Sequence, residues 1–185
     1  MSYIQEFISE STKSYPRWIG TEMEDYHLLG PKKKGDLGEL IVEKVMSEYG
    51  HIVKPPSCGY NGPYDRNIDD FDTEIKFSVS QDKDDELMIN HVKSEIKWDR
   101  FIFYGWNLIK PHRFVWCTKE DMEKCREDTS LWGFQSGEEE FMCSSANVFK
   151  WINSPYTRDI ETWNDEPKLY TGLEGFLCDG NIHTG

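Results

Sequence analysis

The chain lacks the sequence features that would place it in several large classes of protein. It has no run of about 18 apolar residues, so no transmembrane helix is expected. Its first residues, Met-Ser-Tyr-Ile-Gln-Glu, lack the basic start and apolar core of a signal peptide. Loops of the G-x-S-x-G and Walker types are also absent. We therefore expect a cytoplasmic protein with no membrane segment.

Cysteine is scarce and shows no pattern. Its five positions contain no C-x-x-C pair, so neither a zinc ribbon nor a disulfide framework is supported, and reduced thiols are the simplest interpretation. At 185 residues the chain is long enough for one core, and 14% aromatic residues argue against disorder. We expect a single domain, 1–185, with a core at about 30–118 and a C-terminal elaboration at 119–185.

Basic residues are few: 21 Lys and Arg face 34 Asp and Glu, for a net charge of −13. DNA affinity usually comes from phosphate neutralisation by Lys and Arg, so this balance argues against a DNA-binding protein. A small, acidic, aromatic-rich protein can instead act as a DNA mimic. One local exception is the basic run Lys32, Lys33 and Lys34, which either clamps a backbone phosphate or forms a solvated loop.

A strand is predicted at 72–79, where polar and apolar residues alternate for most of the length. Side chains two apart on a strand share one face, so Glu74 and Lys76 project together while Ile75 faces a core. If Asp69 and Asp70 form a two-residue turn, segment 64–68 folds back against 71–77. The pairs are then Ile68 with Phe71, Asn67 with Asp72, Arg66 with Thr73, and Asp65 with Glu74.

This pairing would place two carboxylates side by side. Asp65 and Glu74 would lie roughly 5 Å apart on one face and repel each other unless a cation lay between them. A divalent metal would supply that charge, with Lys76 beside it. Asp-Asp is a poor primed turn compared with Asn-Gly, so a longer loop with a shifted register is the alternative.

These residues resemble the motif of a known nuclease superfamily. Pro-Tyr-Asp at 63–65 followed by Glu-Ile-Lys at 74–76 resembles the PD-(D/E)XK superfamily, which includes type II restriction endonucleases and archaeal Holliday-junction resolvases. The chain departs from the motif by inserting Tyr64 between Pro and Asp. Gly-Asp-Leu-Gly-Glu at 35–39 also resembles the first helix of that superfamily. The resemblance covers about 30–118.

The resemblance implies a fold, an activity and a set of site residues. The fold is α/β, with a central mixed β-sheet flanked by helices. The activity is Mg²⁺-dependent hydrolysis of double-stranded DNA by an endonuclease, with Mn²⁺ as a substitute. Asp65, Glu74 and the carbonyl of Ile75 would hold the metal, Glu39 would help, and Lys76 would orient or deprotonate the attacking water.

Within that class we expect a site-specific, restriction-type homodimer that cuts both strands. A structure-selective resolvase or repair nuclease is the second hypothesis, and the acidic DNA mimic is the third. His91 is a candidate helper base or phosphate contact, although the sequence favours a partly exposed helix residue at this position.

Two site assignments have structural alternatives. Glu39 also fits a capping box with Asp36 as the N-cap of a helix at 36–49, which would explain it without a metal. Glu95 and Lys97 repeat the Glu-x-Lys spacing, but they fall in a stretch, 87–97, that is predicted helical. Residues two apart on a helix diverge around its axis, so this copy is not expected to form a site.

The remaining pattern predicts alternating helices and strands. Helices are expected at 3–11, 36–49, 87–97, 119–127 (capped by Thr118) and 146–153 (capped by Ser144 or Ser145), and strands at 51–54, within the 60–79 hairpin, and at 100–104 and 113–117. The last quarter is poorly patterned and could serve in dimerisation, in DNA contact or as a cover for a sheet edge.

Overall fold

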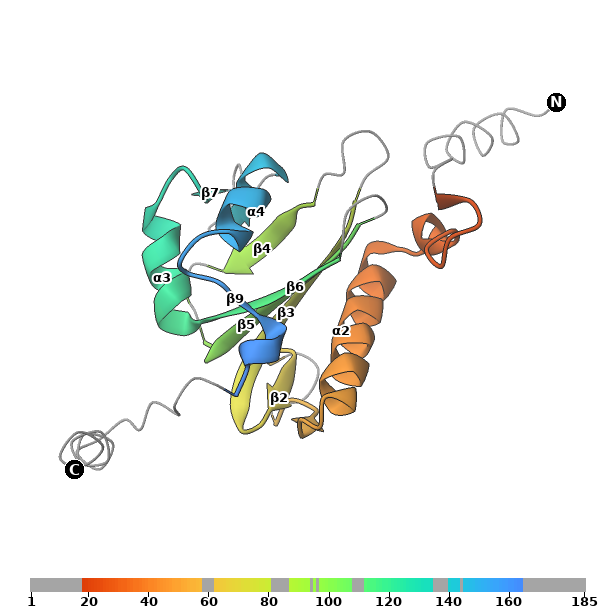
Figure 1. Cartoon of the computed structure of the whole chain (residues 1–185), viewed down its shortest axis with the longest axis horizontal. Helices are drawn as coiled ribbons and strands as arrows, with labels where there is room; N and C mark the ends of the chain where they lie inside the picture. Colours follow the sequence, from red (N-terminus) through yellow and green to blue (C-terminus); the bar gives the residue numbers. More distant parts are fainter. Residues whose placement is uncertain are drawn as a thin grey trace.

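The computed structural model describes residues 18–57, 62–80, 87–93, 95, 97–107, 112–134, 140–143 and 145–164. A mixed six-stranded sheet has the order β1-β2-β3-β5-β6-β9, and a smaller sheet has the order β4-β8-β7. Helix α2 covers one face of the large sheet, while α3, α4 and the small sheet cover the other (Figure 1). The predicted α/β class is confirmed, and the helix expected at 3–11 lies outside the described residues.

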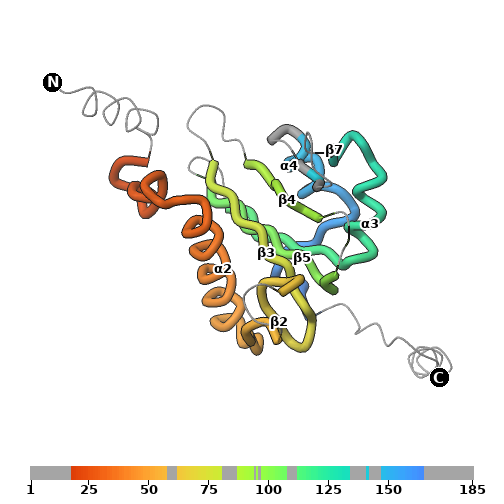
Figure 2. The backbone as a smooth tube through the Cα atoms, turned by 180° about the vertical axis from the view of Figure 1, so that it is seen from behind, coloured from red at the N-terminus to blue at the C-terminus, as the bar shows by residue number. Residues whose placement is uncertain are grey.

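The strands of the large sheet are β1 (Val53–Lys54), β2 (Arg66–Ile68), β3 (Phe71–Val79), β5 (Arg100–Trp106), β6 (Arg113–Thr118) and β9 (Arg158–Asp159). Among the strand pairs that the described residues form in this sheet, only β3–β5 is parallel, which requires the chain to cross over between them. The tube in Figure 2 shows β3 and β5 side by side at the centre of the molecule. The small sheet contains β4 (Ile89–Lys93), β7 (Gly133–Phe134) and β8 (Glu140–Cys143).

Helix α2 (Pro31–Glu48) begins five residues earlier than predicted. Gly30 is its N-cap and Pro31 takes the first helical position, where a missing N–H costs nothing. The helix ends in a Schellman motif, because Gly50 has a φ of +89° and the His51 N–H reaches the Met46 carbonyl at 3.0 Å. The capping box at 36–39 is therefore wrong, and Lys32, Lys33 and Lys34 belong to the first turn of the helix.

The β2–β3 hairpin has the predicted register at the three pairs that the strands contain: Arg66 with Thr73, Asn67 with Asp72, and Ile68 with Phe71. Asp69 and Asp70 both have positive φ, 51° and 70°, as a two-residue type I′ turn requires. The short turn is thus formed despite its unfavourable residues.

Asp69 explains how the turn is stabilised. Its carboxylate accepts hydrogen bonds from the Ile52 N–H at 2.9 Å and the Trp163 Nε1–H at 3.1 Å, and it lies 2.7 Å from Nδ1 of His51. One side chain thereby joins the hairpin to the segment after α2 and to the C-terminal segment. Asp70 forms an exposed ion pair with Lys54.

We expect Asp69→Ala to lower the free energy of unfolding by about 2 kcal/mol, because the buried Trp163 N–H loses its acceptor. Urea denaturation followed by tryptophan fluorescence measures this. Asp70→Ala is the matched control: it carries the same left-handed backbone cost, and the ion pair with Lys54 that it removes is exposed and worth at most about 1 kcal/mol. Equal losses in the two variants would contradict the role given to the Asp69 carboxylate.

The predicted helix at 87–97 is wrong, because residues 89–93 form strand β4. The register of β4 against β8 shifts between Ile89 and Val92, and His91 there has a φ of +58°. This bulge brings two buried residues that are three apart onto the same side of a strand. The resulting apolar spacing imitates that of a helix.

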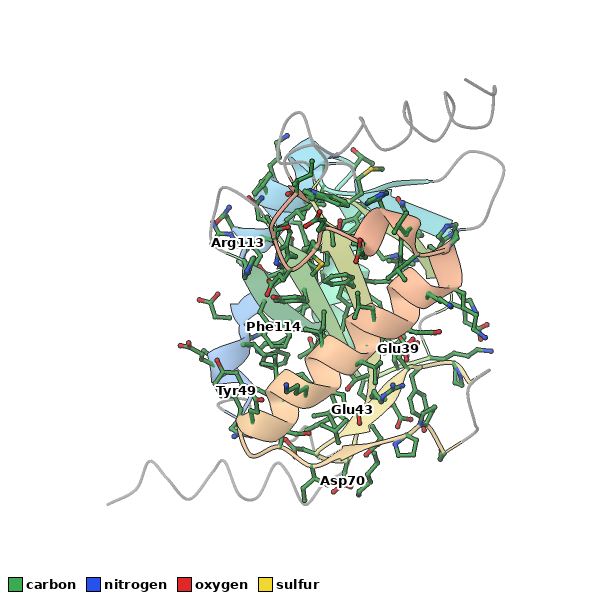
Figure 3. The ribbon with its side chains drawn as sticks, turned by 90° about the vertical axis from the view of Figure 1, so that its right-hand side faces the viewer. Glu39, Glu43, Tyr49, Asp70, Arg113 and Phe114 are labelled. Carbon is green, nitrogen blue, oxygen red and sulfur yellow. The ribbon has the colours of Figure 1, made fainter. Side chains whose placement is uncertain are left out.

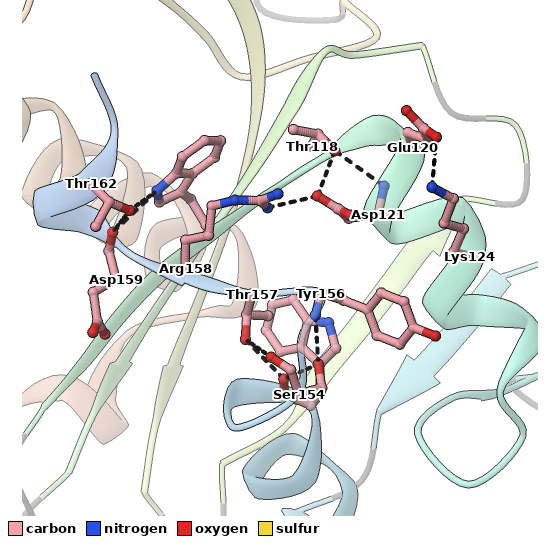
Figure 4. Close-up of polar contacts among 12 residues, drawn as sticks. Thr118, Glu120, Asp121, Lys124, Ser154, Tyr156, Thr157, Arg158, Asp159 and Thr162 are labelled. Carbon is pink, nitrogen blue, oxygen red and sulfur yellow. Dashed lines mark hydrogen bonds and ion pairs between the residues drawn. The ribbon is translucent and has the colours of Figure 1, made fainter. Parts of the chain in front are cut away.

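The other predicted elements agree closely with the structure. Helix α3 (Lys119–Glu127) is capped as expected, since the Thr118 hydroxyl accepts the Asp121 N–H at 3.1 Å. Asp121 also accepts a hydrogen bond from Arg158 of β9 at 2.6 Å (Figure 4). Helix α4 (Ser145–Ile152) begins at Ser145, so of the two proposed caps only Ser144 precedes it, and Ser144 lies outside the described residues.

The poorly patterned C-terminal region covers the sheet as far as it is described. Strand β9 pairs with β6 at the edge of the large sheet, and the short 3-10 helix η3 (Ile160–Thr162) follows it. Trp163 is buried in the cluster under α2, and Trp151 is buried in the cluster on the opposite face. Of the three predicted roles, the edge cover is the one that these contacts support.

Candidate active site at strand β3

Glu74 and Lys76 form an ion pair on one face of β3. Lys76 Nζ lies 2.5 Å from Glu74 Oε1, and the side chains of Lys76 and Glu74 are only 25% and 16% exposed, respectively. Ile75 between them points into the core beneath α2. Strand periodicity therefore gives the arrangement that the sequence predicted.

The second Glu-x-Lys copy also forms an ion pair, contrary to the prediction. Lys97 Nζ lies 3.0 Å from Glu95 Oε2, but these side chains are 55% and 74% exposed. The predicted helix that would have separated them is absent from the described part of 87–97. Burial rather than secondary structure distinguishes the two copies, since an exposed pair is screened by water.

Asp65 lies directly before β2 and reaches across to β3. Its Oδ2 accepts a hydrogen bond from the Ile75 N–H at 2.7 Å, and its own N–H donates to the Thr73 carbonyl at 3.0 Å. In a strand the N–H and the carbonyl of one residue lie on the same edge. The Ile75 carbonyl is therefore on the strand edge that Asp65 approaches, as the predicted ligand set requires.

The charges around Glu74 oppose one another. Burial raises the pKa of the Glu74 carboxyl, Lys76 lowers that pKa, Asp65 raises it and Lys93 lowers it, with a net shift upward. The two lysines, Lys76 and Lys93, thus do not fully offset the desolvation of the ionised Glu74 carboxylate. A bound cation would offset it.

Glu39 approaches the same place from α2. Its Oε2 accepts a hydrogen bond from Arg66 Nη1 at 2.7 Å, while Arg66 Nε donates to Glu43 at 3.0 Å and Nη1 also donates to the Asp65 carbonyl at 2.7 Å. Figure 3 shows Glu39 and Glu43 on successive turns of α2. Burial and the charge of Asp65 raise the pKa of Glu39, whereas Arg66 lowers it. Arg66 thus holds Glu39 near Asp65.

Two pockets adjoin these residues. The first has a volume of about 410 Å³ and is lined by Lys32, Asp36, Glu39, Leu40, Pro56, Tyr64, Asp65 and Arg66. The second has a volume of about 330 Å³ and is lined by Tyr26, Pro31, Lys34, Gly35, Lys76, Phe77 and 88–91. Each therefore contains one lysine of the first turn of α2 together with one part of the Asp65–Glu74–Lys76 group.

The four predicted DNA contacts are not equally placed. Lys32 lines the first pocket, while Lys34 and His91 line the second, so the fold brings these three to the site. Lys33 is exposed on α2 and lines neither. His91 stands on strand β4 rather than on the predicted helix.

Two charged residues near the site, Arg66 and Lys93, were not predicted from the sequence to take part in it. Arg66 was only placed in the hairpin register, although its position opposite Thr73 could have suggested that it faces α2 with Glu39 and Glu43. Lys93 carries no sequence signal, because it comes from the small sheet and the stretch was expected to be helical.

The donors present fit Mg²⁺ only in part. Asp65, Glu74 and the Ile75 carbonyl are all oxygen donors, and Mg²⁺ often uses one or two carboxylates and keeps several waters. Among the described residues, however, no three His, Cys, Asp or Glu side chains lie close enough to form a metal site. A site with two carboxylates, Asp65 and Glu74, stays a prediction, and so does Glu39 as a further direct ligand.

Comparisons with known proteins leave the family open. No protein-family model and no curated protein matches the sequence. One solved structure, that of a bacterial homing endonuclease, aligns with 82% of this chain and 93% of its own at 13% identity, with a TM-score of 0.35. This likeness is too weak to establish a shared fold. No helix in the described part of the chain is long and apolar enough to cross a membrane.

Proposed function

We propose that the chain is a divalent-metal-dependent DNA endonuclease with Asp65, Glu74 and Lys76 as its catalytic residues and Glu39 in support. The observation that carries this proposal is the half-buried Glu74–Lys76 ion pair, with Asp65 bound to the intervening Ile75 N–H. An ion pair with a purely structural role adds little to the stability of the fold when it is buried, because the desolvation of the two charges offsets their attraction. Perturbed, partly buried charges beside pockets are typical of active sites.

The proposed chemistry assigns a role to each residue. Asp65 and Glu74, with the Ile75 carbonyl, would hold Mg²⁺ or Mn²⁺, which when bound acidifies a water and stabilises charge on a phosphoryl oxygen. Lys76 orients or deprotonates the attacking water and offsets the negative charge of the transition state. Arg66 keeps Glu39 in place through its hydrogen bond.

Local charge supports DNA binding despite the net charge of −13. Lys32 and Lys34 lie in the first turn of α2, where the helix dipole adds partial positive charge. Lys93 acts electrostatically on Glu74 from the opposite sheet. These groups can neutralise a few phosphates, so we expect affinity that falls steeply with salt.

Within this function we favour a site-specific enzyme that acts on duplex DNA as a homodimer, because a two-fold pair of sites cuts both strands. A structure-selective nuclease is the alternative. The test is incubation with supercoiled, linear and branched DNA in Mg²⁺, Mn²⁺ or EDTA. Discrete metal-dependent fragments would support the site-specific enzyme, and cutting only of branched DNA would support the structure-selective nuclease. If no substrate is cut, the hypothesis of an acidic DNA mimic is favoured instead.

Metal binding has a readout that does not depend on cleavage. We expect 10 mM Mg²⁺ or Mn²⁺ to raise the melting temperature, because a ligand that binds only the folded state stabilises it by about 2.7 kcal/mol at a hundred times its Kd. Asp65→Asn and Glu74→Gln should remove this increase, since each deletes a ligand charge. Glu95→Gln, in the exposed copy of the motif, is the matched control and should keep it.

The metal effect should also depend on pH. Only ionised Glu74 can act as a ligand, and its pKa in the folded protein is raised by burial. Metal-induced stabilisation should therefore be present at neutral pH and decline as the pH falls, beginning above the ordinary glutamate pKa of about 4.3. Thermal melts at a series of pH values, with and without metal, measure this decline.

Without metal the sign is reversed. A carboxyl whose folded pKa is raised contributes stability below its unfolded pKa and loses that contribution as the pH rises through the folded value. In the metal-free protein the contribution of Glu74 to the free energy of unfolding should therefore be greatest at acidic pH and decrease as the pH rises. A metal effect that persists unchanged to pH 4 would contradict the assignment of Glu74 as a ligand.

A further inference from the structure

The second pocket, beside Lys76, has polar and aromatic walls that the cleavage chemistry does not use. Residues before and within the first turn of α2, residues of β3 and residues of β4 form it. At about 330 Å³ it lies at the small end of the range of ligand pockets, which suits a single flat ring system with its neighbouring group.

One wall of this pocket contains an unsatisfied acceptor. Asn90 lines the pocket, and its Oδ1 is closed to solvent and has no hydrogen-bond partner among the described residues. A buried amide oxygen left unpaired costs about 1–3 kcal/mol, so such an atom in a pocket wall points to a ligand that brings an N–H or O–H group. A DNA phosphodiester offers no such donor, whereas the edge of a nucleobase does.

Asn90 lies within a bulge of strand β4. The β4 bulge falls between Ile89 and Val92, which are both buried, and His91 within it adopts a φ of +58°. Bulges re-aim side chains without disturbing the flanking core residues. A strained non-glycine backbone of this kind is often found at ligand sites.

The other walls suit a base and its phosphate. Tyr26 and Phe77 supply aromatic surface, and their rings contact each other edge to face at 5.9 Å between centroids. Burial raises the pKa of Tyr26 to about 12, so its phenol stays neutral at physiological pH. Lys34 Nζ lies 4.9 Å from the centre of the Tyr26 ring and adds a positive charge.

We propose that this pocket receives an unpaired nucleobase of the DNA substrate, next to the phosphodiester that is cut, with Asn90 as the residue that selects the base. The inference rests on the proposed nuclease function and names its substrate more closely. Oδ1 of Asn90 is closed to solvent, so the side chain turns toward the pocket to meet the base. A base within a stacked duplex cannot enter the pocket, so the base is extruded or already single-stranded. Lys34 then contacts the adjoining phosphate.

The amide chemistry predicts which base is preferred. Asn offers one acceptor and one donor, which match the N6 amine and N7 of adenine. Adenine should therefore be enriched about tenfold at one position beside the cut. Asn90→Asp keeps the acceptor but loses the donor, so the preference should move towards cytosine, whose N4 amine needs only an acceptor. A merely structural role for Asn90 would leave base preference unchanged.

The experiment uses the full chain with Mg²⁺ and a pool of duplex and single-stranded DNAs that are randomised over ten positions. Sequencing of the cut ends gives the base preference of the wild type and of Asn90→Asp. Asn153→Asp is the matched control, because it makes the same change at an exposed residue near the end of α4. In parallel, 2-aminopurine next to the preferred adenine should brighten on binding, because extrusion of the adenine unstacks its neighbour, and Lys34→Gln should weaken that increase.

The outcomes separate the two proposals. Enrichment of adenine that moves to cytosine in Asn90→Asp, with no change in Asn153→Asp, supports the base pocket. Metal-dependent cutting with the same base preference in all variants, and with no increase in 2-aminopurine fluorescence, would overturn the base pocket and leave the nuclease intact. Absence of cutting by the wild type would instead overturn the nuclease function and the base pocket with it.

Discussion

Lys76→Ala should reduce DNA cleavage by about 10²–10⁴-fold while DNA affinity changes little. The variant removes the group that orients water and offsets transition-state charge, but it removes only one of several cations near the bound phosphates. Gel-based cleavage and filter-binding assays measure the two quantities, with binding in EDTA so that no DNA is cut. Loss of binding in parallel with cleavage would contradict the catalytic role of Lys76.

The exposed copy of the motif provides a matched control for this prediction. Lys97→Ala deletes the same charge from the same Glu-x-Lys spacing, but at a side chain that is 55% exposed. Cleavage should stay within about twofold of the wild type, because an exposed pair contributes little. Equal losses in the two variants would mean that net charge, and not the geometry of β3, sets activity.

Gly38→Ala should lower the free energy of unfolding by about 3 kcal/mol, near the upper end of ordinary overpacking effects. A Cβ on Gly38 would lie 2.2 Å from Cβ of Phe77, an atom too close to the backbone to move aside. Phe77 is also held by its stacked contact with Tyr104. For a chain of this size the melting temperature should fall by roughly 6–12 °C.

The effect should extend to the site, because Phe77 follows Lys76 on β3. Gly35→Ala is the matched control on the same helix: nothing lies within 4 Å of its added Cβ. Alanine is the better helix former by about 0.5–1 kcal/mol, so this variant should be more stable than the wild type. Destabilisation by both changes would point to helix propensity and against close packing of α2 on β3.

Local pattern was sufficient for much of the fold and part of the site. Alternation placed Glu74 and Lys76 on one face of β3, and the two-residue turn fixed the register of Arg66 to Ile68 against β3. Thr118 identified the start of α3, because its cap depends on neighbours three residues away. These features rest on contacts close in sequence, which the local pattern of residues encodes directly.

Local pattern failed where a long-range contact altered the backbone. The bulge at His91 gave a strand the apolar spacing of a helix, and it exists because β4 pairs with β8 about fifty residues later. The start of α2 was misplaced because Asp36 resembles a cap, whereas Gly30 and Pro31 provide the true one.

The sequence by itself determined the α/β class, the β2–β3 hairpin and the Glu74–Lys76 pair, since each follows from the two-residue period of strands. Only the tertiary structure decided that Asp65 binds the Ile75 N–H, that Arg66 fixes Glu39, and that Lys93 and Asn90 belong to the same region. The physical reason is that burial and electrostatic coupling depend on elements distant in sequence that pack together. The same packing separates the half-buried Glu74–Lys76 pair from its solvated copy at 95–97.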